Sequence, residues 1–215
     1  MRGRDIFRYR YCFSGNYILL AKDGINVKKD YPTIYQYLDS FGDSFKNRGA
    51  QGDHWTNLRH CSFYDDFKKE KIVWMELSDH GRFALCDNEI YLLNTAYFLI
   101  PPRQFLSKYL LGILNSQVIE FYLGMIAETS GMGVTRWINE HVKKFPIPEA
   151  EKSRQTAIAE LADRILIIVK DEDYLSDPTK QSRVKELERG IDQMVYELYG
   201  LTPEEIAVVK GTSKK

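Results

Sequence analysis

Apolar and aromatic positions divide the chain into an N-terminal part with strand-like patterns and a C-terminal part with helical ones. Between Ile6 and Leu20, aromatic and β-branched residues partly alternate with polar ones on both sides of Ser14-Gly15-Asn16, which predicts a β-hairpin. After the turn-like residues Lys22 to Gly24, Pro32 suits the first turn of a helix. The spacing of apolar residues extends that helix to about Arg48.

Three short runs rich in β-branched and aromatic residues follow a loop at 49–62 that contains two glycines. The runs are 71–75, 83–85 and 97–100, and the turn-like segments Asp79-His80-Gly81 and Asp87-Asn88-Glu89 separate them. We expect these strands to extend a sheet that the N-terminal hairpin begins.

A long apolar pattern from Phe105 to about Ala127 predicts one mostly buried helix, which Pro101-Pro102 separates from the last strand. A glycine-rich stretch, Ser130 to Gly133, follows it. Phe145-Pro146-Ile147-Pro148 should be extended, because a residue that precedes proline is biased away from helix.

The last third of the chain has the pattern of charged amphipathic helices. Helices over about 155–170 and 180–199 should form an antiparallel hairpin that ends at Gly200, and Thr202-Pro203-Glu204-Glu205 should begin a last short helix. An apolar stripe on this hairpin needs a surface to pack against. Its members are Ile158, Leu161, Ile165, Leu187, Ile191, Met194 and Leu198.

These patterns together predict a mixed α+β fold. Residues 1–150 should form a β-sheet domain with packed helices, and residues 151–215 a C-terminal helical hairpin and tail. The composition agrees with a folded chain, since 44% of the 215 residues are hydrophobic and 13% are aromatic.

Charge is balanced overall but not along the chain. Thirty basic residues offset thirty acidic ones, whereas residues 1–60 alone carry ten basic and six acidic side chains. A surface that binds phosphates should therefore draw mainly on the first segment.

Cysteine usage and hydropathy indicate the compartment. Cys12, Cys61 and Cys86 include no C-x-x-C pair and fit free thiols in a reducing cytoplasm. The longest apolar runs, such as residues 165–169, are far shorter than a membrane span, so we expect a cytoplasmic protein with no membrane partner.

The common catalytic motifs are absent from the sequence. It contains no G-x-G-x-x-G, P-loop, G-x-S-x-G or H-E-x-x-H. The one Pro-Pro, at Pro101-Pro102, lacks the preceding amide and the following aromatic residue of an adenine methyltransferase motif. We therefore expect no enzymatic activity from this chain alone.

Two groups of residues leave a chemical alternative open. His54, His60, Cys61, His80 and Cys86 lie in one stretch, but their spacing suits separate structural residues better than zinc ligands. Asp65-Asp66 with Glu70-Lys71 could suggest a metal-dependent nuclease, although a charged turn before a strand explains them more simply. We predict no metal site.

The loop around 48–59 offers side chains that could read DNA bases. Arginine, glutamine, asparagine and histidine supply hydrogen-bonding groups for base edges, and tryptophan supplies a stacking face. A polar connection with one buried tryptophan is the alternative interpretation. The candidate base readers are Arg48, Gln51, His54, Trp55, Asn57, Arg59 and, outside the loop, Arg82; the candidate phosphate contacts are Arg4, Arg10, Lys28, Lys29 and Arg136.

Several segments, taken in order, resemble the C-terminal specificity (target recognition) domain of TaqI-like and Eco57I-like type II restriction-modification enzymes, including those of types IIG and IIS. The helical segment Tyr109 to Ser116 followed by Phe145 to Pro148 also resembles the specificity subunits of type I systems. The matching segments are Gly3-Arg4-Asp5-Ile6 with Arg8-Tyr9, Gly52 to Trp55 with Leu58, Lys71-Ile72-Val73, Phe83 with Asp87, Tyr109 to Ser116, Phe145 to Pro148, and Ile191 to Thr202.

The resemblance implies a module that selects a sequence in double-stranded DNA and has no catalysis of its own. Methyltransferase or nuclease domains, in the same parent chain or in a partner subunit, would then bind S-adenosylmethionine, flip the adenine and, for a nuclease, use Mg²⁺. No cofactor is expected in this chain. Because methionine directly precedes Arg2-Gly3-Arg4-Asp5-Ile6, we expect a segment of a longer protein.

A helical protein-interaction or assembly module is the alternative function, in which the hairpin at 151–200 pairs with another chain. It predicts association that is insensitive to salt, whereas DNA binding weakens steeply as salt rises. Asn115 and Ser116 are expected to bond a neighbouring backbone rather than DNA.

Overall fold

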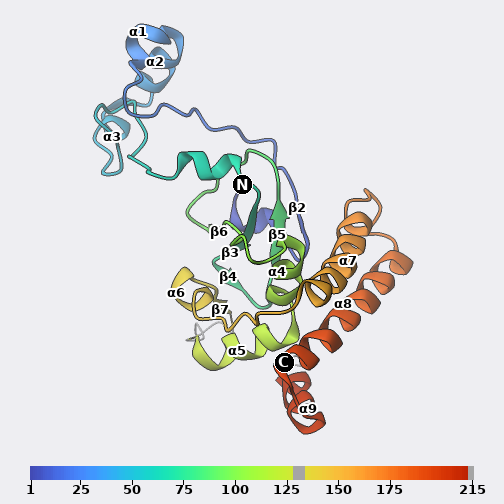
Figure 1. The fold of residues 1–215 in the computed structure, drawn as a ribbon. Helices are drawn as coiled ribbons and strands as arrows, with labels where there is room; N and C mark the ends of the chain where they lie inside the picture. The colour runs from blue at the N-terminus through green and yellow to red at the C-terminus, as the bar shows by residue number, and fades with distance from the viewer. Residues whose placement is uncertain (128–133, 213–215) are drawn as a thin grey trace. The chain divides into compact units, whose positions relative to one another are not determined.

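The computed structural model describes residues 1–127 and 134–212 and confirms the mixed α+β fold, with 46% helix and 11% strand (Figure 1). The chain forms two compact units: unit 1 contains residues 1–14 and 67–215, and unit 2 contains residues 15–66. The C-terminal helices thus belong to the same compact unit as the sheet. The functional division at residue 150 stays a prediction.

A three-stranded antiparallel sheet forms the centre of unit 1. β3 (Lys71–Met75) lies between β5 (Phe83–Cys86) and β6 (Ala96–Leu99), with Trp74 opposite Phe83 on one side and Tyr97 on the other. The three strands agree with the three predicted runs. β3 is almost wholly buried, as expected for a central strand rich in β-branched and aromatic residues.

The N-terminal hairpin is real, but its predicted turn is wrong. β1 (Ile6–Phe7), preceded by the 3₁₀ helix η1 (Gly3–Asp5), pairs with β2 (Arg10–Tyr11). The chain therefore turns at Arg8-Tyr9 and not at Ser14 to Asn16. Tyr9 adopts a φ of +62°, and its N–H donates to the Phe83 carbonyl at 2.9 Å. Burial of the ring and this hydrogen bond stabilise a conformation that tyrosine rarely adopts.

A second small sheet completes the β structure of unit 1. β4 (Leu77–Ser78) pairs with β7 (Thr135–Arg136), and α6 (Asn139–Val142) follows. Between β7 and α6, the buried Trp137 accepts a hydrogen bond from Trp74 Nε1 on its carbonyl oxygen, at 2.7 Å. This bond connects the two sheets. The glycine-rich Ser130 to Gly133 lies outside the described residues.

The predicted helix at 105–127 is two helices, α4 (Ser107–Leu114) and α5 (Gln117–Ile126), whose axes bend by 58°. Asn115 causes the break: its side chain accepts from the Phe83 N–H at 3.1 Å and donates to the Phe83 carbonyl at 3.0 Å. Ser116 then caps α5 by accepting from the Ile119 N–H. The expectation that both residues satisfy backbone groups is confirmed.

No single described helix is long and apolar enough to cross a membrane. α4 and α5 reach the required length and composition only as a pair. Every α4 residue from Tyr109 to Leu114 is buried in the main hydrophobic core, so the apolar character of α4 is that of a core helix.

The C-terminal helices agree with the predicted hairpin. α7 (Lys152–Val169) and α8 (Pro178–Tyr199) lie side by side in Figure 1, and α9 (Pro203–Thr212) follows Gly200, whose φ of +64° ends α8. The surface that the apolar stripe required is α4 of the same unit. A β-carbon at Gly112 of α4 would lie 2.8 Å from Ile158 Cγ2, so only glycine allows this approach without movement of Ile158.

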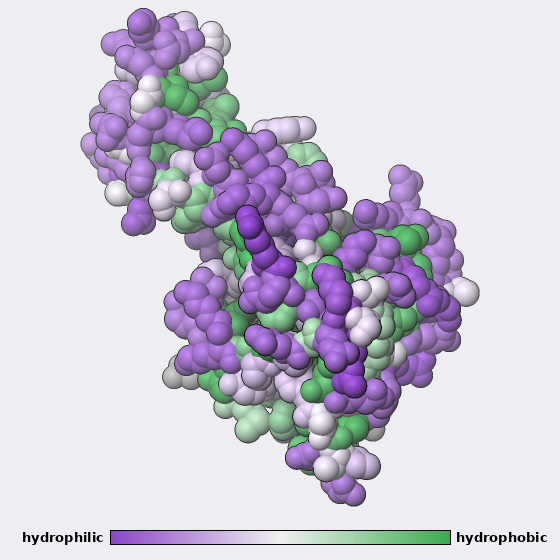
Figure 2. Space-filling view, viewed as in Figure 1, coloured by the Kyte–Doolittle hydropathy of each residue, from purple (hydrophilic) through white to green (hydrophobic). Residues whose placement is uncertain are grey.

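Unit 2 contains short helices and no strand ladder among its regular elements: α1 (Val27–Asp30), α2 (Pro32–Asp39), α3 (Gly42–Lys46) and, at the boundary with unit 1, the 3₁₀ helix η2 (Tyr64–Lys68). The single helix predicted from Pro32 to Arg48 is wrong, because Gly42 adopts a φ of +75° between α2 and α3. On the face that Figure 2 shows, hydrophobic side chains are visible among the mostly hydrophilic ones of this unit.

Candidate functional site

The loop after α3 is held in one shape by Arg48 and Asn57. The guanidinium of Arg48 donates to the carbonyl oxygens of Trp55 at 2.5 Å and Asn57 at 2.8 Å. The buried amide nitrogen of Asn57 donates to the carbonyl oxygens of Lys22 at 2.9 Å and Ile25 at 3.0 Å. Both of these predicted base readers therefore use their donors to build the loop in this structure.

An isolated β-bridge between Gln51 and Leu58 closes the same loop. Gly52 is required beside it, since a β-carbon there would lie 2.2 Å from Asp23 Oδ1 and 2.6 Å from the Leu58 carbonyl oxygen. Asp23 Oδ1 also accepts from the Asp53 N–H at 3.2 Å. The residues here that resemble the known family, Gly52 to Trp55 with Leu58, thus lie in a closed and braced loop.

Aromatic rings form a continuous array beneath this loop. Ring centroids are 5.1 Å apart for Tyr37 and Phe41, 5.4 Å for Phe41 and Phe45, and 6.2 Å for Phe45 and Trp55. Tyr35 lies 5.3 Å from Trp55 on the other side of the array. Trp55 is therefore a half-buried member of a packed cluster, which agrees in part with the alternative interpretation of this loop.

Cations lie over several rings of the array. Lys46 Nζ is 5.5 Å from the Trp55 ring centroid, and the Arg48 guanidinium is 4.6 Å from that of Phe45. Lys28, which is exposed on α1 with Lys29, places its Nζ 5.5 Å from the Tyr35 ring. These contacts keep positive charge on the aromatic side of unit 2.

Three of the predicted base readers are exposed on the loop: Gln51, His54 and Arg59. His54 Nδ1 accepts the Thr56 N–H at 3.2 Å, so the neutral ring carries its proton on Nε2. The loop thereby presents an amide, a ring N–H and a guanidinium, which together can donate to and accept from the edges of bases.

The remaining predicted contacts lie in unit 1 on separate elements. Arg4 is exposed on η1, and Arg136 on β7 pairs with Glu76 at 2.7 Å. Arg10 on β2 donates to Cys12 Sγ at 3.0 Å, and Arg82, between β4 and β5, pairs with Asp79 at 2.7 Å. The structure thus brings the loop candidates together, but these four occupy four different positions of unit 1.

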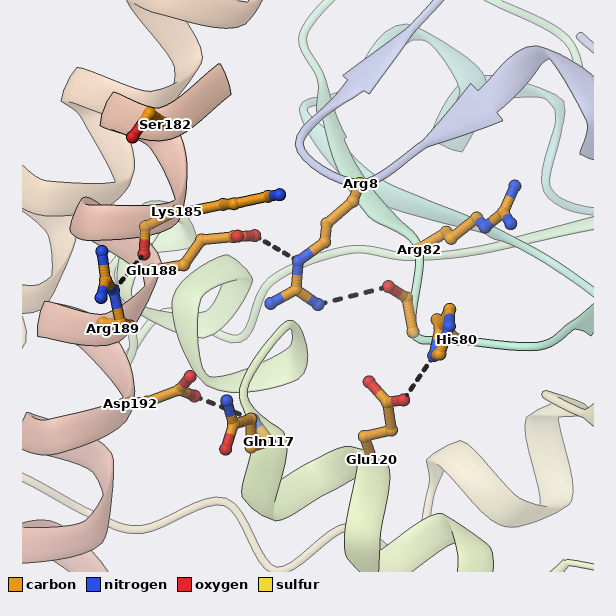
Figure 3. A pocket seen from close by; sticks show the side chains of 11 residues that line it. Arg8, His80, Arg82, Gln117, Glu120, Ser182, Lys185, Glu188, Arg189 and Asp192 are labelled. Carbon is orange, nitrogen blue, oxygen red and sulfur yellow. Dashed lines mark hydrogen bonds and ion pairs between the residues drawn. The ribbon is translucent and has the colours of Figure 1, made fainter. Parts of the chain in front are cut away.

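Arg8 has a role that composition did not indicate. Its guanidinium forms an ion pair with Glu188 of α8 and donates to the carbonyl oxygens of Asn115 and Gly81 (Figure 3). The arginine thereby joins the N-terminal turn, α8 and the break between α4 and α5. The sequence did carry one signal for this contact. Glu188 lies next to the buried apolar stripe of α8, and a carboxylate in such a place needs a cationic partner.

Asp192, one turn after Glu188, is 5% exposed and accepts the Gln117 N–H at 2.9 Å. Burial raises the pKa of Asp192 to about 6, against the opposing effects of this hydrogen bond and of Arg8. The folded protein thus binds a proton on Asp192 in a pH range where an unfolded chain has released it.

The elevated pKa of Asp192 should make stability depend on pH. Its contribution is fully present below about pH 4 and is lost as pH rises through about 6, with a size of about 2–3 kcal/mol. Asp192→Asn retains an acceptor for Gln117 and should gain stability relative to wild type over this range. Urea unfolding from pH 4 to 7.5 measures this gain in stability, and Glu160→Gln, at an exposed position, serves as the control. Parallel stability profiles for wild type and Asp192→Asn would contradict the raised pKa of Asp192.

The residues that suggested a metal-dependent nuclease do not form such a site in the described part of the chain. Lys71 is fully buried, and its ammonium donates to the carbonyl oxygens of Phe67, Lys69 and Asn88 at 2.8, 3.1 and 2.7 Å. Lys71 therefore ties η2 to the turn after β5. No group of three or more histidine, cysteine or acidic residues within the described ranges could hold a metal ion.

Two of the histidines considered as possible zinc ligands contact acidic side chains instead. His60 Nδ1 lies 3.4 Å from Asp23, and His80 Nδ1 lies 2.7 Å from Glu120. The three cysteines are free thiols, of which Cys86 is buried. These residues act as separate structural groups in the described structure.

Comparison with known proteins gives two matches. Residues 1–147 match the TaqI-like C-terminal specificity domain. Over 213 residues the chain is 20% identical to the type II methyltransferase M.BstVI of Geobacillus stearothermophilus, an alignment that covers 96% of this chain and 34% of that protein. The chain thus spans about a third of the length of this curated relative.

Proposed function

Because the chain belongs to the family of TaqI-like C-terminal specificity domains, we propose that it recognises a specific sequence in double-stranded DNA for the catalytic domains of a restriction-modification methyltransferase. Those domains would bind S-adenosylmethionine and act on an adenine. Recognition itself requires phosphate contacts for position and base contacts for specificity.

The braced loop of unit 2 is the observation that carries this proposal. Arg48 and Asn57 fix the main chain, so that Gln51, His54 and Arg59 are presented from a rigid frame rather than from a flexible connection. Base-edge readout depends on such preorganisation, because each side chain must meet donors and acceptors at set positions. We assign base reading to these three residues and framing to Arg48, Trp55 and Asn57.

Phosphate contacts in this proposal come from Lys28 and Lys29, which are exposed on α1 in the same unit. Arg4, Arg10 and Arg136 of unit 1 are further candidates, of which Arg4 and Arg136 are exposed. Asn26 fixes the start of α1 by accepting from the Lys29 N–H at 3.0 Å, so the two lysines have a defined backbone.

The alternative, an assembly module based on the helical hairpin, has lost the observation that motivated it. The stripe residues Ile158, Ile165, Leu187 and Ile191 are all buried within unit 1 and belong to its main core. On this hairpin, Ile167 and Leu175 are large hydrophobic side chains that stay exposed. We therefore develop the DNA-recognition proposal alone.

The test is selection of bound sequences from a random duplex library. Wild type should enrich one motif, and Gln51→Ala/Arg59→Ala should lose preference at one or more base pairs, because each bidentate base contact contributes about 1–3 kcal/mol of discrimination. Arg103→Ala, an exposed arginine outside the loop, serves as control and should enrich the wild-type motif.

Two results would count against the proposal. If the loop variant and wild type enrich the same motif with the same stringency, the loop does not read bases. If wild type binds no duplex even at about 50 mM salt, where phosphate contacts are strongest, the chain alone is not a DNA-binding module.

A further inference from the structure

A cleft of about 620 Å³ in unit 1 lies outside the loop described above (Figure 3). α8 lines one side, the turn between β4 and β5 lines another, and the first turn of α5 lies at its base. All of α8, including its cleft-lining residues, lies beyond residue 147, where the match to the specificity-domain family ends.

The carboxylates of this cleft already have partners. Glu188 is paired with Arg8, and Glu120 lies 2.7 Å from His80 Nδ1. Asp192 accepts the Gln117 N–H, and its raised pKa of about 6 reduces the cost of burying it near other acids. The acidic side chains are therefore largely compensated within the cleft.

Two cations on α8 lack such compensation. Lys185 and Arg189 are exposed one helical turn apart, and neither takes part in an ion pair among the described residues. Lys185 extends from α8 toward Arg8 in Figure 3, and Arg189 Nε donates to the Lys185 carbonyl at 3.3 Å. Ser182, also exposed, precedes them on the same lining face and adds a hydroxyl.

We propose that this cleft binds the phosphodiester backbone of DNA through Lys185 and Arg189, so that the C-terminal hairpin forms part of the DNA-binding surface. This inference rests on the proposed function. An ammonium and a guanidinium one turn apart, with a hydroxyl beside them, suit the oxygens of adjacent phosphates. Such contacts are independent of sequence and would hold the position of the duplex while another surface reads it.

The rigid anchoring of α8 favours a role for these two cations in binding DNA over a role as ordinary solvent-exposed side chains. Arg8 and Glu188 anchor the middle of the helix to the N-terminal turn, and Gly112 allows close packing of Ile191 and Ile158 beneath it. Lys185 and Arg189 thus project from a rigid backbone, and ordering it on binding would add little entropic cost. Rigid cations lose less on binding than cations on a mobile tail.

The test measures the binding of a fluorescently labelled random-sequence 20-base-pair duplex to the full chain at several salt concentrations. Lys185→Ala/Arg189→Ala should reduce the slope of log affinity against log salt by about 2, since each phosphate contact contributes about 0.9. The fall in affinity between about 50 and 200 mM salt should then be roughly tenfold smaller than for wild type.

Arg164→Ala/Arg183→Ala is the matched control. It also removes two exposed positive charges from the hairpin, but neither residue lines the cleft. Equal slopes for the two double variants would overturn the inference. If wild type binds and Gln51→Ala/Arg59→Ala changes the selected motif while the cleft variant keeps the wild-type slope, only the cleft assignment fails. If wild type does not bind duplex DNA, the proposed function and this inference fail together.

Discussion

Arg8→Met is expected to lower the free energy of unfolding by about 3 kcal/mol, because it leaves Glu188 largely buried without its cation. The substitution also removes donors from the carbonyl oxygens of Asn115 and Gly81. Urea unfolding at pH 7 measures the loss. Arg8→Lys keeps the charge but cannot reach three acceptors with a planar fork, so it should lose an intermediate amount.

A double-mutant cycle separates the ion pair from packing. Arg8→Met/Glu188→Met removes both charges, and it should be more stable than Arg8→Met alone because no buried carboxylate is left unpaired. Additive losses in the two single variants would show that Arg8 and Glu188 do not stabilise each other. Arg183→Met, whose partner Glu186 is exposed, should change stability by less than about 1 kcal/mol.

The second large effect should come from Asn115→Leu, with a loss of about 2–3 kcal/mol. Leucine has a similar size but leaves the buried Phe83 N–H without an acceptor, and a buried unsatisfied group costs about 1–3 kcal/mol. It also removes the helix break that turns α5 away from α4. Thermal unfolding measures the total effect.

Hydrogen exchange localises the effect of Asn115→Leu. The Phe83 amide should exchange faster in the variant, whereas Ser116→Ala, which removes the cap of α5, should leave Phe83 protected and cost about 1 kcal/mol. Unchanged protection at Phe83 would contradict the role assigned to the Asn115 side chain.

The three central strands and the C-terminal helices were predictable because their signals are local. β-branched and aromatic runs bounded by turn residues identified β3, β5 and β6. The cap at Gly200 and the apolar spacing of α7 and α8 identified the hairpin. In these segments, propensity, pattern and tertiary packing all favour the same structure.

Two of the mispredicted elements, the N-terminal turn and the helix break at Asn115, depend on contacts between distant residues. Nothing local marks Arg8-Tyr9 as a turn, since its geometry depends on burial of Tyr9 and on its bond to Phe83. Asn115 alone does not predict the end of a helix, because the break depends on hydrogen bonds between its side chain and the backbone of Phe83. Gly42 did carry a local signal, and the regular spacing of aromatic residues across it concealed the break.

The candidate site shows the same limit. Residue types located the loop, but they could not separate Arg48 and Asn57, which brace it, from Gln51 and Arg59, which are exposed. The same types of hydrogen-bonding residue occur whether the side chain faces a ligand or a carbonyl oxygen of its own chain. Only the folded geometry distinguishes the two uses.

The contact between Arg8 and Glu188 joins residues 180 positions apart in the sequence. During synthesis, the turn at Arg8 therefore cannot form this contact until α8, about 180 residues later, has emerged from the ribosome. Contacts of such long range slow folding, because the loop entropy is lost before the contact forms. Nascent chains that end before α8 should consequently fail to complete the fold of unit 1 and should depend on chaperones. Premature termination should therefore yield protein that is degraded rather than partly active.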